Sequence, residues 1–211
     1  MKSRPALLLA ASFFAFWSCA ENPADTTADA EVGEAQEQVS TPAPGESAIT
    51  YVLSDASTIE FLGSKAVGSH GGGFREFSGQ FTVDDGQLVG DQNSFVIDMK
   101  STWSDNDNLT KHLKNDDFFS VPDFPTSTFV LTGIEEKSPG QYSVTGNLEL
   151  RGVTKSVTFP AEVEVSDSQV TMKSKFDINR FDWNIKYAGM QDNLIRPEVV
   201  ITLDLIAEPK A

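Results

Sequence analysis

Residues 68–79 contain the tetrapeptide His-Gly-Gly-Gly, which lines the oxyanion hole in many lipases and esterases. That chemistry also needs a nucleophile in a Gly-x-Ser-x-Gly turn, followed along the chain by an acid and a histidine. The sequence has no Gly-x-Ser-x-Gly, and His112 is its only later histidine. Ser69 and His70, taken as a minimal catalytic pair, have no orienting acid or oxyanion site that the sequence identifies. We therefore expect no enzyme, and we expect the glycines at 71–73 to supply positive φ angles in a hairpin turn or bulge.

The residues that bind metals are equally sparse. Zinc and copper need several His, Cys or carboxylate ligands at set spacing, and this chain has two isolated histidines and one cysteine. Five acidic residues could hold calcium weakly, but EF-hand spacing is absent and a solvated acidic loop is the better interpretation. They are Asp105, Asp107, Asp116, Asp117 and Asp123. The sequence predicts no metal and no cofactor.

The chain begins MKSRPALLLAASFFAFWSC, in which two basic residues precede an apolar run of signal-peptide length. The Ser-Cys pair at its end resembles a bacterial lipobox, where cleavage precedes the cysteine and the thiol carries a diacylglycerol. We expect residues 1–18 to be a lipoprotein signal peptide and Cys19 to carry the lipid. The alternative is a plain signal peptide with an incidental cysteine. The lipid would hold the protein to a membrane of the bacterial cell envelope, facing the periplasm, and Ala20 in place of aspartate favours the outer membrane.

Residues 19–48 form an acidic segment without aromatic side chains. Such a composition cannot bury enough apolar surface to fold, so we expect a disordered tether. The whole chain carries a formal net charge of -15. This balance argues against nucleic acid as a partner, because phosphates demand a basic face, and against an electrostatic hold on anionic lipid.

Residues 49–211 alternate apolar and polar side chains in runs separated by turn residues, which is typical of antiparallel strands. The fold class predicted is all-β, an eight-stranded up-and-down barrel in one domain. A barrel of this size encloses either side chains or one small ligand. Four small residues expected to point inward favour a cavity, as does the number of phenylalanines, although a core filled by those aromatics is an equal alternative. The small residues are Gly63, Gly79, Gly146 and Ser174.

A short helix is expected over residues 106–115, near one end of the barrel. Leu109, His112 and Leu113 would share one face, and Asp105 or Asn106 would cap its start. His112 is interpreted as a structural or surface histidine.

Four blocks together resemble the YceI-like family of exported lipid-binding proteins: FLGSKAVGSHGGGF, HLKNDDFFSVPDFPTSTF, VTGNLELRGVTKSVTFP and FDINRFDWNI. They occur in the family's order from about residue 51 to 208. The resemblance implies a lipocalin-like, eight-stranded barrel whose apolar interior holds a long isoprenoid or similar amphiphilic chain. Gly72 departs from the threonine that many members carry in the corresponding turn, which puts a specific hydrogen bond from that turn in doubt.

If a lipid is bound, its polar end should lie at the barrel mouth and its tail inside. We expect the tail to contact Phe61, Phe81, Phe95, Ile97, Phe129, Leu131, Leu148, Phe176 and Trp183. We expect the head group to meet Lys65, His70, Arg151, Asn179, Arg180 and Tyr187. Lys65 would need a partner such as Asp177 or Asp182, or would reach solvent at a strand end. Arg180 could instead form a structural ion pair. A slip of one residue in register would exchange the inward and outward sets.

Two functions therefore stand at this point. The first is a non-enzymatic carrier or store of a polyisoprenoid-type lipid, held to a membrane through Cys19. The second is an interaction module of the envelope whose barrel is filled by its own side chains. Homodimer formation is possible in either case.

Overall fold

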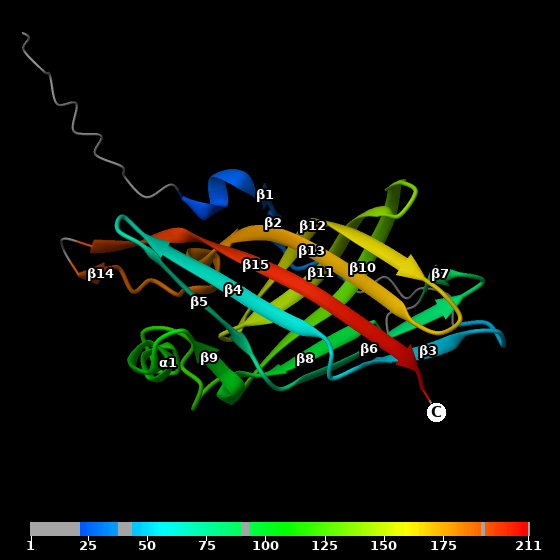
Figure 1. The fold of residues 1–211 in the computed structure, drawn as a ribbon, viewed down its shortest axis with the longest axis horizontal. Helices are drawn as coiled ribbons and strands as arrows, with labels where there is room; N and C mark the ends of the chain where they lie inside the picture. Colours follow the sequence, from blue (N-terminus) through cyan, green and yellow to red (C-terminus); the bar gives the residue numbers. More distant parts are fainter. Residues whose placement is uncertain (1–21, 38–43, 90–92, 191–192, 211) are drawn as a thin grey trace, which may run out of the picture.

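The computed structural model describes residues 22–37, 44–89, 93–190 and 193–210, and within these ranges the fold is built mainly from strands (Figure 1). The strands are β1 (Ala28–Asp29), β2 (Glu31–Glu34), β3 (Ile49–Leu53), β4 (Thr58–Lys65), β5 (Ser69–Phe74), β6 (Phe77–Asp84), β7 (Gln87–Leu88), β8 (Ser94–Asp98), β9 (Thr102–Ser104), β10 (Thr126–Ser138), β11 (Gln141–Leu150), β12 (Val153–Val165), β13 (Val170–Asn179), β14 (Gly189–Met190) and β15 (Asn193–Pro209). The helical elements are α1 (Asp107–Leu113) and three single 3-10 turns, η1 (Pro23–Thr26), η2 (Met99–Ser101) and η3 (Arg180–Trp183).

The strands close into the predicted eight-stranded antiparallel barrel. Two of the barrel strands are bent, so that β3 continues into β4 and β5 continues into β6. The long strand β15 closes the barrel, because it pairs with β13 on one side and with β4 and β3 on the other. Every neighbouring pair in this circuit is antiparallel, as expected for an up-and-down connection.

The barrel is packed at one end and hollow at the other. Tyr51, Val163 and Val170 are almost fully buried, and they lie where β3, β12 and β13 run beside the last residues of β15, at the end where the C-terminus lies (Figure 1). We call this the closed end. The opposite end carries α1 and η3, and we call it the mouth. The two alternatives of a filled core and a cavity therefore both occur, each in one half of the same barrel.

The predicted helix is present, and Asn106 rather than Asp105 caps it. The Asn106 side chain accepts hydrogen bonds from the backbone N–H groups of Asn108 and Leu109, both at 3.0 Å. These bonds satisfy donors that the first helical turn leaves unpaired. As expected, α1 lies at one end of the barrel, with Leu113 on its buried side.

The glycines of the His-Gly-Gly-Gly sequence lie in strand β5, so the expected hairpin turn or bulge was wrong. The turn lies three residues before Gly71, at Gly68, whose φ is 94°. Gly72 and Gly73 are required for close packing instead. A Cβ on Gly72 would lie 2.4 Å from the Trp103 carbonyl oxygen, and one on Gly73 would lie 2.6 Å from the Ile59 carbonyl oxygen. A strand glycine of this kind marks a close approach by its neighbours.

Two of the four small inward residues do not open the cavity as expected. A Cβ on Gly79 would lie 2.3 Å from the Phe95 ring, and one on Gly146 would lie 2.2 Å from the Phe129 ring. These glycines let the two phenylalanine rings lie flat against the barrel wall. Gly63 has open space in front of it, and the Ser174 hydroxyl donates to the Pro160 carbonyl.

Residues 22–37 are folded onto the barrel, in contrast to the disordered tether expected for residues 19–48. Strands β12 and β13 pair only over residues 162–165 and 170–173, and they separate at Pro160. A proline has no N–H for a sheet ladder, which explains why the pairing ends there. The N-terminal segment fills the resulting gap (Figure 1): β2 pairs antiparallel with β12, and β1 pairs parallel with β13.

This N-terminal segment spans several strands on the outside of the barrel. The Asn22 amide lies 3.5 Å from Glu198 and 3.3 Å from the Ser64 hydroxyl at one end, while Gln36 exchanges backbone hydrogen bonds with the Asn147 side chain at the other. Composition could not predict this docking because the stabilisation comes from pairing with two unpaired strand edges, and little comes from an apolar core of the segment itself.

A buried carboxyl, Asp177, lies under this segment and makes the stability depend on pH. Burial is the main cause that raises its pKa, and the carboxylates of Asp29 on β1 and Glu198 on β15 add to it, while the Thr27 hydroxyl opposes them. A raised native pKa means that the folded chain holds a proton that the unfolded chain has released, so stability falls as pH rises from the ordinary aspartate pKa through the native value.

We expect Asp177→Asn to increase the free energy of unfolding at pH 7, and the gain should shrink as the pH is lowered towards the ordinary aspartate pKa, because the native carboxyl takes up its proton at a higher pH than the unfolded one. Denaturant unfolding across this range measures the difference. Asp167→Asn, in the exposed turn between β12 and β13, is the control and should give no comparable slope. A gain for Asp177→Asn that grows at low pH would show that the sign is wrong.

Candidate functional site

The hollow half of the barrel contains a cavity of about 210 Å³. Its wall comes from nearly every barrel strand and from the segments that cover the mouth. The wall residues include Ile59, Phe61, Gly63, Phe74, Phe95, Ile97, Leu113, Phe118, Phe119, Phe129, Leu148, Leu150, Val157, Phe159, Phe176, Ile178, Ile185, Ile195, Val199, Ile201 and Leu203. Strand alternation places them inward because successive side chains of a strand point to opposite faces.

A row of aromatic rings forms the floor of this cavity. Phe81, Phe95, Phe129, Phe159 and Phe176 follow one another around the interior, with neighbouring ring centroids 4.3 to 6.3 Å apart. The stacked pair in this row, Phe159 and Phe176, belongs to β12 and β13 on the two sides of the gap that the N-terminal segment fills. Met172 and Leu205, which pair with each other on β13 and β15 nearer the closed end, also line the cavity, so it reaches past this row on that side.

Six of the nine residues expected to contact a lipid tail lie in the cavity wall: Phe61, Phe95, Ile97, Phe129, Leu148 and Phe176. Phe81, Leu131 and Trp183 do not. Phe81, the last ring of the aromatic row, and Leu131 are buried, with 1% and 7% of their surfaces exposed, and neither lines the cavity. Trp183 is fully buried in η3, and its indole N–H donates to the Leu148 carbonyl at 3.2 Å. It packs near the mouth without forming part of the wall.

Two arginines expected to meet a head group are occupied with structural contacts. Arg180 is 4% exposed and donates to the carbonyls of Arg196, Ile185 and Ile195. Burial lowers its pKa, and Glu198 opposes that effect. Arg151 donates to the carbonyls of Asn184 and Asp116, at 3.0 and 2.7 Å. It thereby joins the loop after α1 to the loop after η3 across the mouth.

Of the six head-group candidates only Arg180 lines the cavity, and Arg151 and the other four lie outside its wall. Asn179 accepts from the Phe181 N–H and caps η3, at 3.0 Å. The Tyr187 ring packs against His112 and Phe118, with centroids 4.8 and 5.2 Å apart. Lys65 ends β4 at the mouth on the same side of the strand as Gly63, and it is half-buried.

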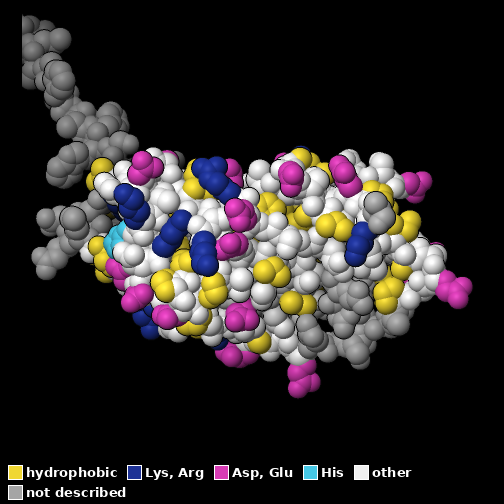
Figure 2. Space-filling view, turned by 90° about the horizontal axis from the view of Figure 1, so that it is seen from below, with side chains coloured by type: hydrophobic (Ala, Val, Ile, Leu, Met, Phe, Trp, Pro, Cys, Tyr) yellow, Lys and Arg dark blue, Asp and Glu magenta, His cyan; other side chains and the backbone are white. Residues whose placement is uncertain are grey.

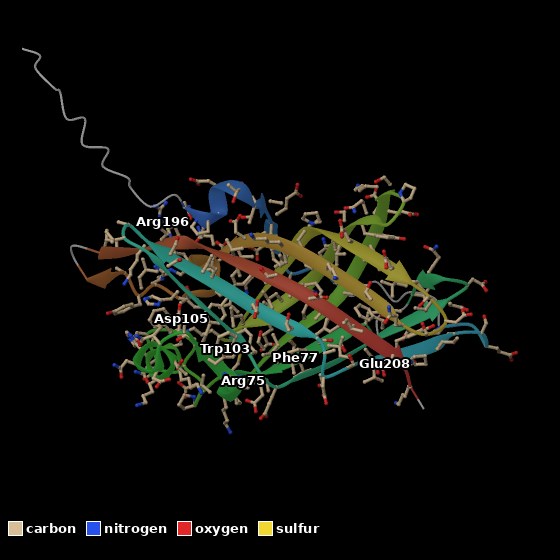
Figure 3. The ribbon with its side chains drawn as sticks, viewed as in Figure 1. Arg75, Phe77, Trp103, Asp105, Arg196 and Glu208 are labelled. Atoms are coloured by element: carbon tan, nitrogen blue, oxygen red, sulfur yellow. The ribbon has the colours of Figure 1, made fainter. Side chains whose placement is uncertain are left out.

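His70 on β5 pairs with a carboxylate that the sequence did not assign to it. Its Nδ1 lies 2.8 Å from Asp105, and this contact, helped by the Gly71 N–H, holds the pKa of Asp105 below its usual value. Figure 3 shows Asp105 beside α1 at the mouth. Ser69, the neighbouring residue of an extended strand, points to the opposite face from His70, so the pair has no nucleophile from that serine.

The acidic residues near α1 contact neighbouring side chains and do not converge on one point. Asp117 lies 2.7 Å from His112, and Asp116 and Asp123 both accept from the Ser120 hydroxyl. Within the described ranges no group of three or more His, Cys, Asp or Glu side chains could hold a metal ion. None of the helices in those ranges is long and apolar enough to cross a bilayer.

The segments over the mouth contribute wall residues that the sequence reasoning missed. Phe118 and Phe119 follow α1, and Ile185 follows η3. The pair of phenylalanines directly after the apolar face of the helix was a usable signal for the first two. No comparable pattern marks Ile185, because its inward position depends on the three carbonyl bonds of Arg180.

The barrel, its aromatic floor and its carbon-lined hollow half define the class as a β-barrel that encloses an apolar ligand cavity. A family model described as a YceI-like domain matches residues 51–207, so the chain belongs to the YceI-like family.

Related sequences come from several bacteria. A UPF0312 protein of Shewanella denitrificans is 32% identical over 139 residues, which are 65% of this chain and 72% of that protein. A UPF0312 protein of Yersinia pestis is 39% identical over 92 residues, which are 44% of this chain and 47% of that protein. The chain thus matches about half the length of some of these relatives.

Solved structures share the fold. BcnA of Burkholderia cenocepacia has a TM-score of 0.64 and 25% identity, and the match covers 72% of this chain and 96% of BcnA. A polyisoprenoid binding domain from Saccharophagus degradans has a TM-score of 0.61 and 19% identity, and the match covers 77% of this chain and 99% of that domain.

Proposed function

We propose that the protein binds an amphiphilic isoprenoid-type lipid in the hollow half of its barrel, as a non-enzymatic carrier or store in the bacterial cell envelope. The observation that carries the proposal is the chemistry of the cavity wall. The few polar side chains in the wall are already occupied, since the Ser127 hydroxyl donates to the Glu149 carbonyl at 2.6 Å and Arg180 donates to backbone carbonyls. The remaining surface is carbon, which favours a hydrocarbon ligand.

The size of the cavity sets the length of chain that it takes. A water-sized group needs about 10–15 Å³ of cavity, so 210 Å³ accommodates on the order of fifteen to twenty carbon atoms. That corresponds to roughly three to four isoprene units. A longer chain would extend through the mouth, where its polar end would reach water. The description of the Saccharophagus domain as polyisoprenoid binding supports the same ligand class.

We further propose that Cys19 carries a lipid and attaches the protein to an envelope membrane, in keeping with the lipobox-like Ser-Cys sequence. Cys19 and residues 1–18 lie outside the described ranges. Acylation would leave the chain with a membrane attachment that needs no spanning helix.

Native mass spectrometry of the full chain, purified from its own host with a membrane-solubilising polymer, tests the proposal. Detergent is avoided because it could enter the cavity, and residues 22–37 are kept because they close the barrel wall. We expect one bound species per chain with isoprene-unit spacing in its homologues, and an acylated N-terminus that is lost in Cys19→Ser. A bare polypeptide that also fails to bind added geranylgeraniol would overturn lipid binding and favour the interaction module.

A further inference from the structure

Three large apolar side chains are exposed at the mouth. Val67 is 75% exposed, Leu194 57% and Phe181 41%. They come from three separate segments: the turn after β4, the start of β15, and η3. Together we call them the rim patch.

Strand pairing and a side-chain hydrogen bond bring these segments to one side of the mouth. Lys65 pairs with Ile195, so the turn after β4 and the start of β15 extend side by side beyond that pair. Arg180 joins η3 to the same strand through the Ile195 carbonyl, and its guanidinium lies 4.6 Å from the centre of the Phe181 ring. The rim patch is therefore one surface built on the segments that frame the cavity.

The charges beside the rim patch suit the boundary between water and hydrocarbon. Lys65 lies two residues before Val67, and Lys186 is exposed in the segment that follows η3. Long lysine side chains can keep their ammonium groups in water while their stems cover apolar surface. Figure 2 shows that basic side chains on one face of the molecule gather towards the α1 end. The net charge of -15 for the whole chain means that apolar contact, and little electrostatic attraction to anionic lipid, would provide the binding energy.

The path of the N-terminal segment indicates what covers the rim patch. Asn22 lies at the mouth, beside Ser64 and Glu198, and from there the chain runs away along the barrel. Figure 3 shows Arg196, two residues before Glu198, at the mouth end, opposite Glu208 at the closed end. Cys19 stands three positions before Asn22 in the sequence, and an extended chain spans at most about 11 Å over that length. A membrane attachment at Cys19 would thus hold the mouth next to the bilayer.

We propose that the rim patch docks onto a lipid bilayer surface, so that the cavity mouth faces the membrane and the ligand passes between bilayer and barrel without crossing water. This inference rests on the lipid-binding function proposed above. The closed end provides a matched control surface, because Ile49 and Val52 on β3 are exposed by 45% and 36%.

The first experiment measures orientation on vesicles of phosphatidylcholine, with the full chain reconstituted. A polarity-sensitive thiol-reactive dye is placed at Val67→Cys or at Asp167→Cys in the closed-end turn, and the unsubstituted chain reports any labelling of Cys19. We expect the dye at 67 to be protected from an aqueous quencher about fivefold more than the dye at 167. Equal protection at the two positions would overturn the docking. Protection at 67 that occurs in native envelopes and not in pure lipid vesicles would also overturn it, because a protein partner would then cover the patch.

The second experiment measures delivery of a fluorescent geranylgeranyl lipid to acceptor vesicles. The triple variant Val67→Asp, Phe181→Asp, Leu194→Asp should transfer it about tenfold more slowly. In this variant charges replace three apolar side chains that the docked protein would bury in the bilayer. The variant Ile49→Asp, Val52→Asp should transfer at the unsubstituted rate. The lipid bound per chain is measured in parallel. Normal binding with an unchanged transfer rate in the triple variant contradicts the docking, whereas absence of bound lipid in every variant contradicts the proposed function.

Discussion

Ile201→Trp is expected to weaken the binding of geranylgeraniol at least a hundredfold while the barrel still folds. Ile201 points into the hollow half from β15, where it pairs with Phe61 on one side and Phe176 on the other. Tryptophan adds about six heavy atoms, which is roughly a third of the chain that the cavity takes. Because each excluded CH₂ contributes about 0.8 kcal/mol, the lost contact amounts to about 5 kcal/mol. The expected loss of affinity is set lower, at a hundredfold, because the ligand can shift and keep part of its contact with the wall.

Thr202→Trp is the matched control for this prediction. Thr202 is the next residue of β15, and its side chain points outward between those of Glu60 and Lys175. The same bulky group there should leave affinity within about twofold. Equilibrium titration with geranylgeraniol and the melting temperature of each variant are measured together. If Ile201→Trp binds as tightly as the unsubstituted chain, the lipid lies elsewhere than in this cavity.

Val32→Asp is expected to lower the free energy of unfolding by about 2–4 kcal/mol and to speed the release of a bound lipid. Val32 is half-buried on β2, pairs with Val157 of β12, and packs against the core. A carboxylate there must be desolvated without a partner, so the N-terminal segment should detach. Strands β12 and β13 would then lose the backbone hydrogen bonds that they make with β2 and β1. The gap between them would expose the stacked pair Phe159 and Phe176.

Gly33→Asp introduces the same carboxylate at the next position of the same strand. A Cβ on Gly33 meets no atom within 4 Å, so the new side chain points into open space. We expect a change within about 0.5 kcal/mol. Denaturant unfolding compares the two variants, and the dissociation rate of the lipid is measured by its exchange into excess vesicles. Equal effects of Val32→Asp and Gly33→Asp would mean that the segment does not contribute to the wall.

The barrel and its short helix could be predicted because their signals are local. Alternation along residues such as Phe95, Ile97 and Phe129 defines the face of each strand without reference to the rest of the chain. The α1 helix has its cap, Asn106, and its apolar face within a few residues of each other. The family resemblance implied the lipocalin-like barrel, and the family-model match over residues 51–207 confirms the family.

The division of the barrel into a filled and a hollow half could not be predicted in this way. Phe81 and Phe95 follow the same alternation and are neighbouring rings of the aromatic row, but only Phe95 lines the cavity. Their depth along the barrel axis depends on the stagger of all eight strands. In the same way the glycine at 146 was expected to open space, and the ring of Phe129 on the neighbouring strand occupies it.

The sequence by itself determined the fold class, the apolar character of the interior and the absence of a hydrolase motif, since each depends on residue types and short spacings. Only the tertiary structure decided that Arg151 and Arg180 hold the mouth together and that residues 22–37 complete the wall. The physical reason is the same for both. These residues are stabilised by backbone groups that distant strands leave unpaired, and an unpaired backbone group leaves no mark in the sequence around its eventual partner.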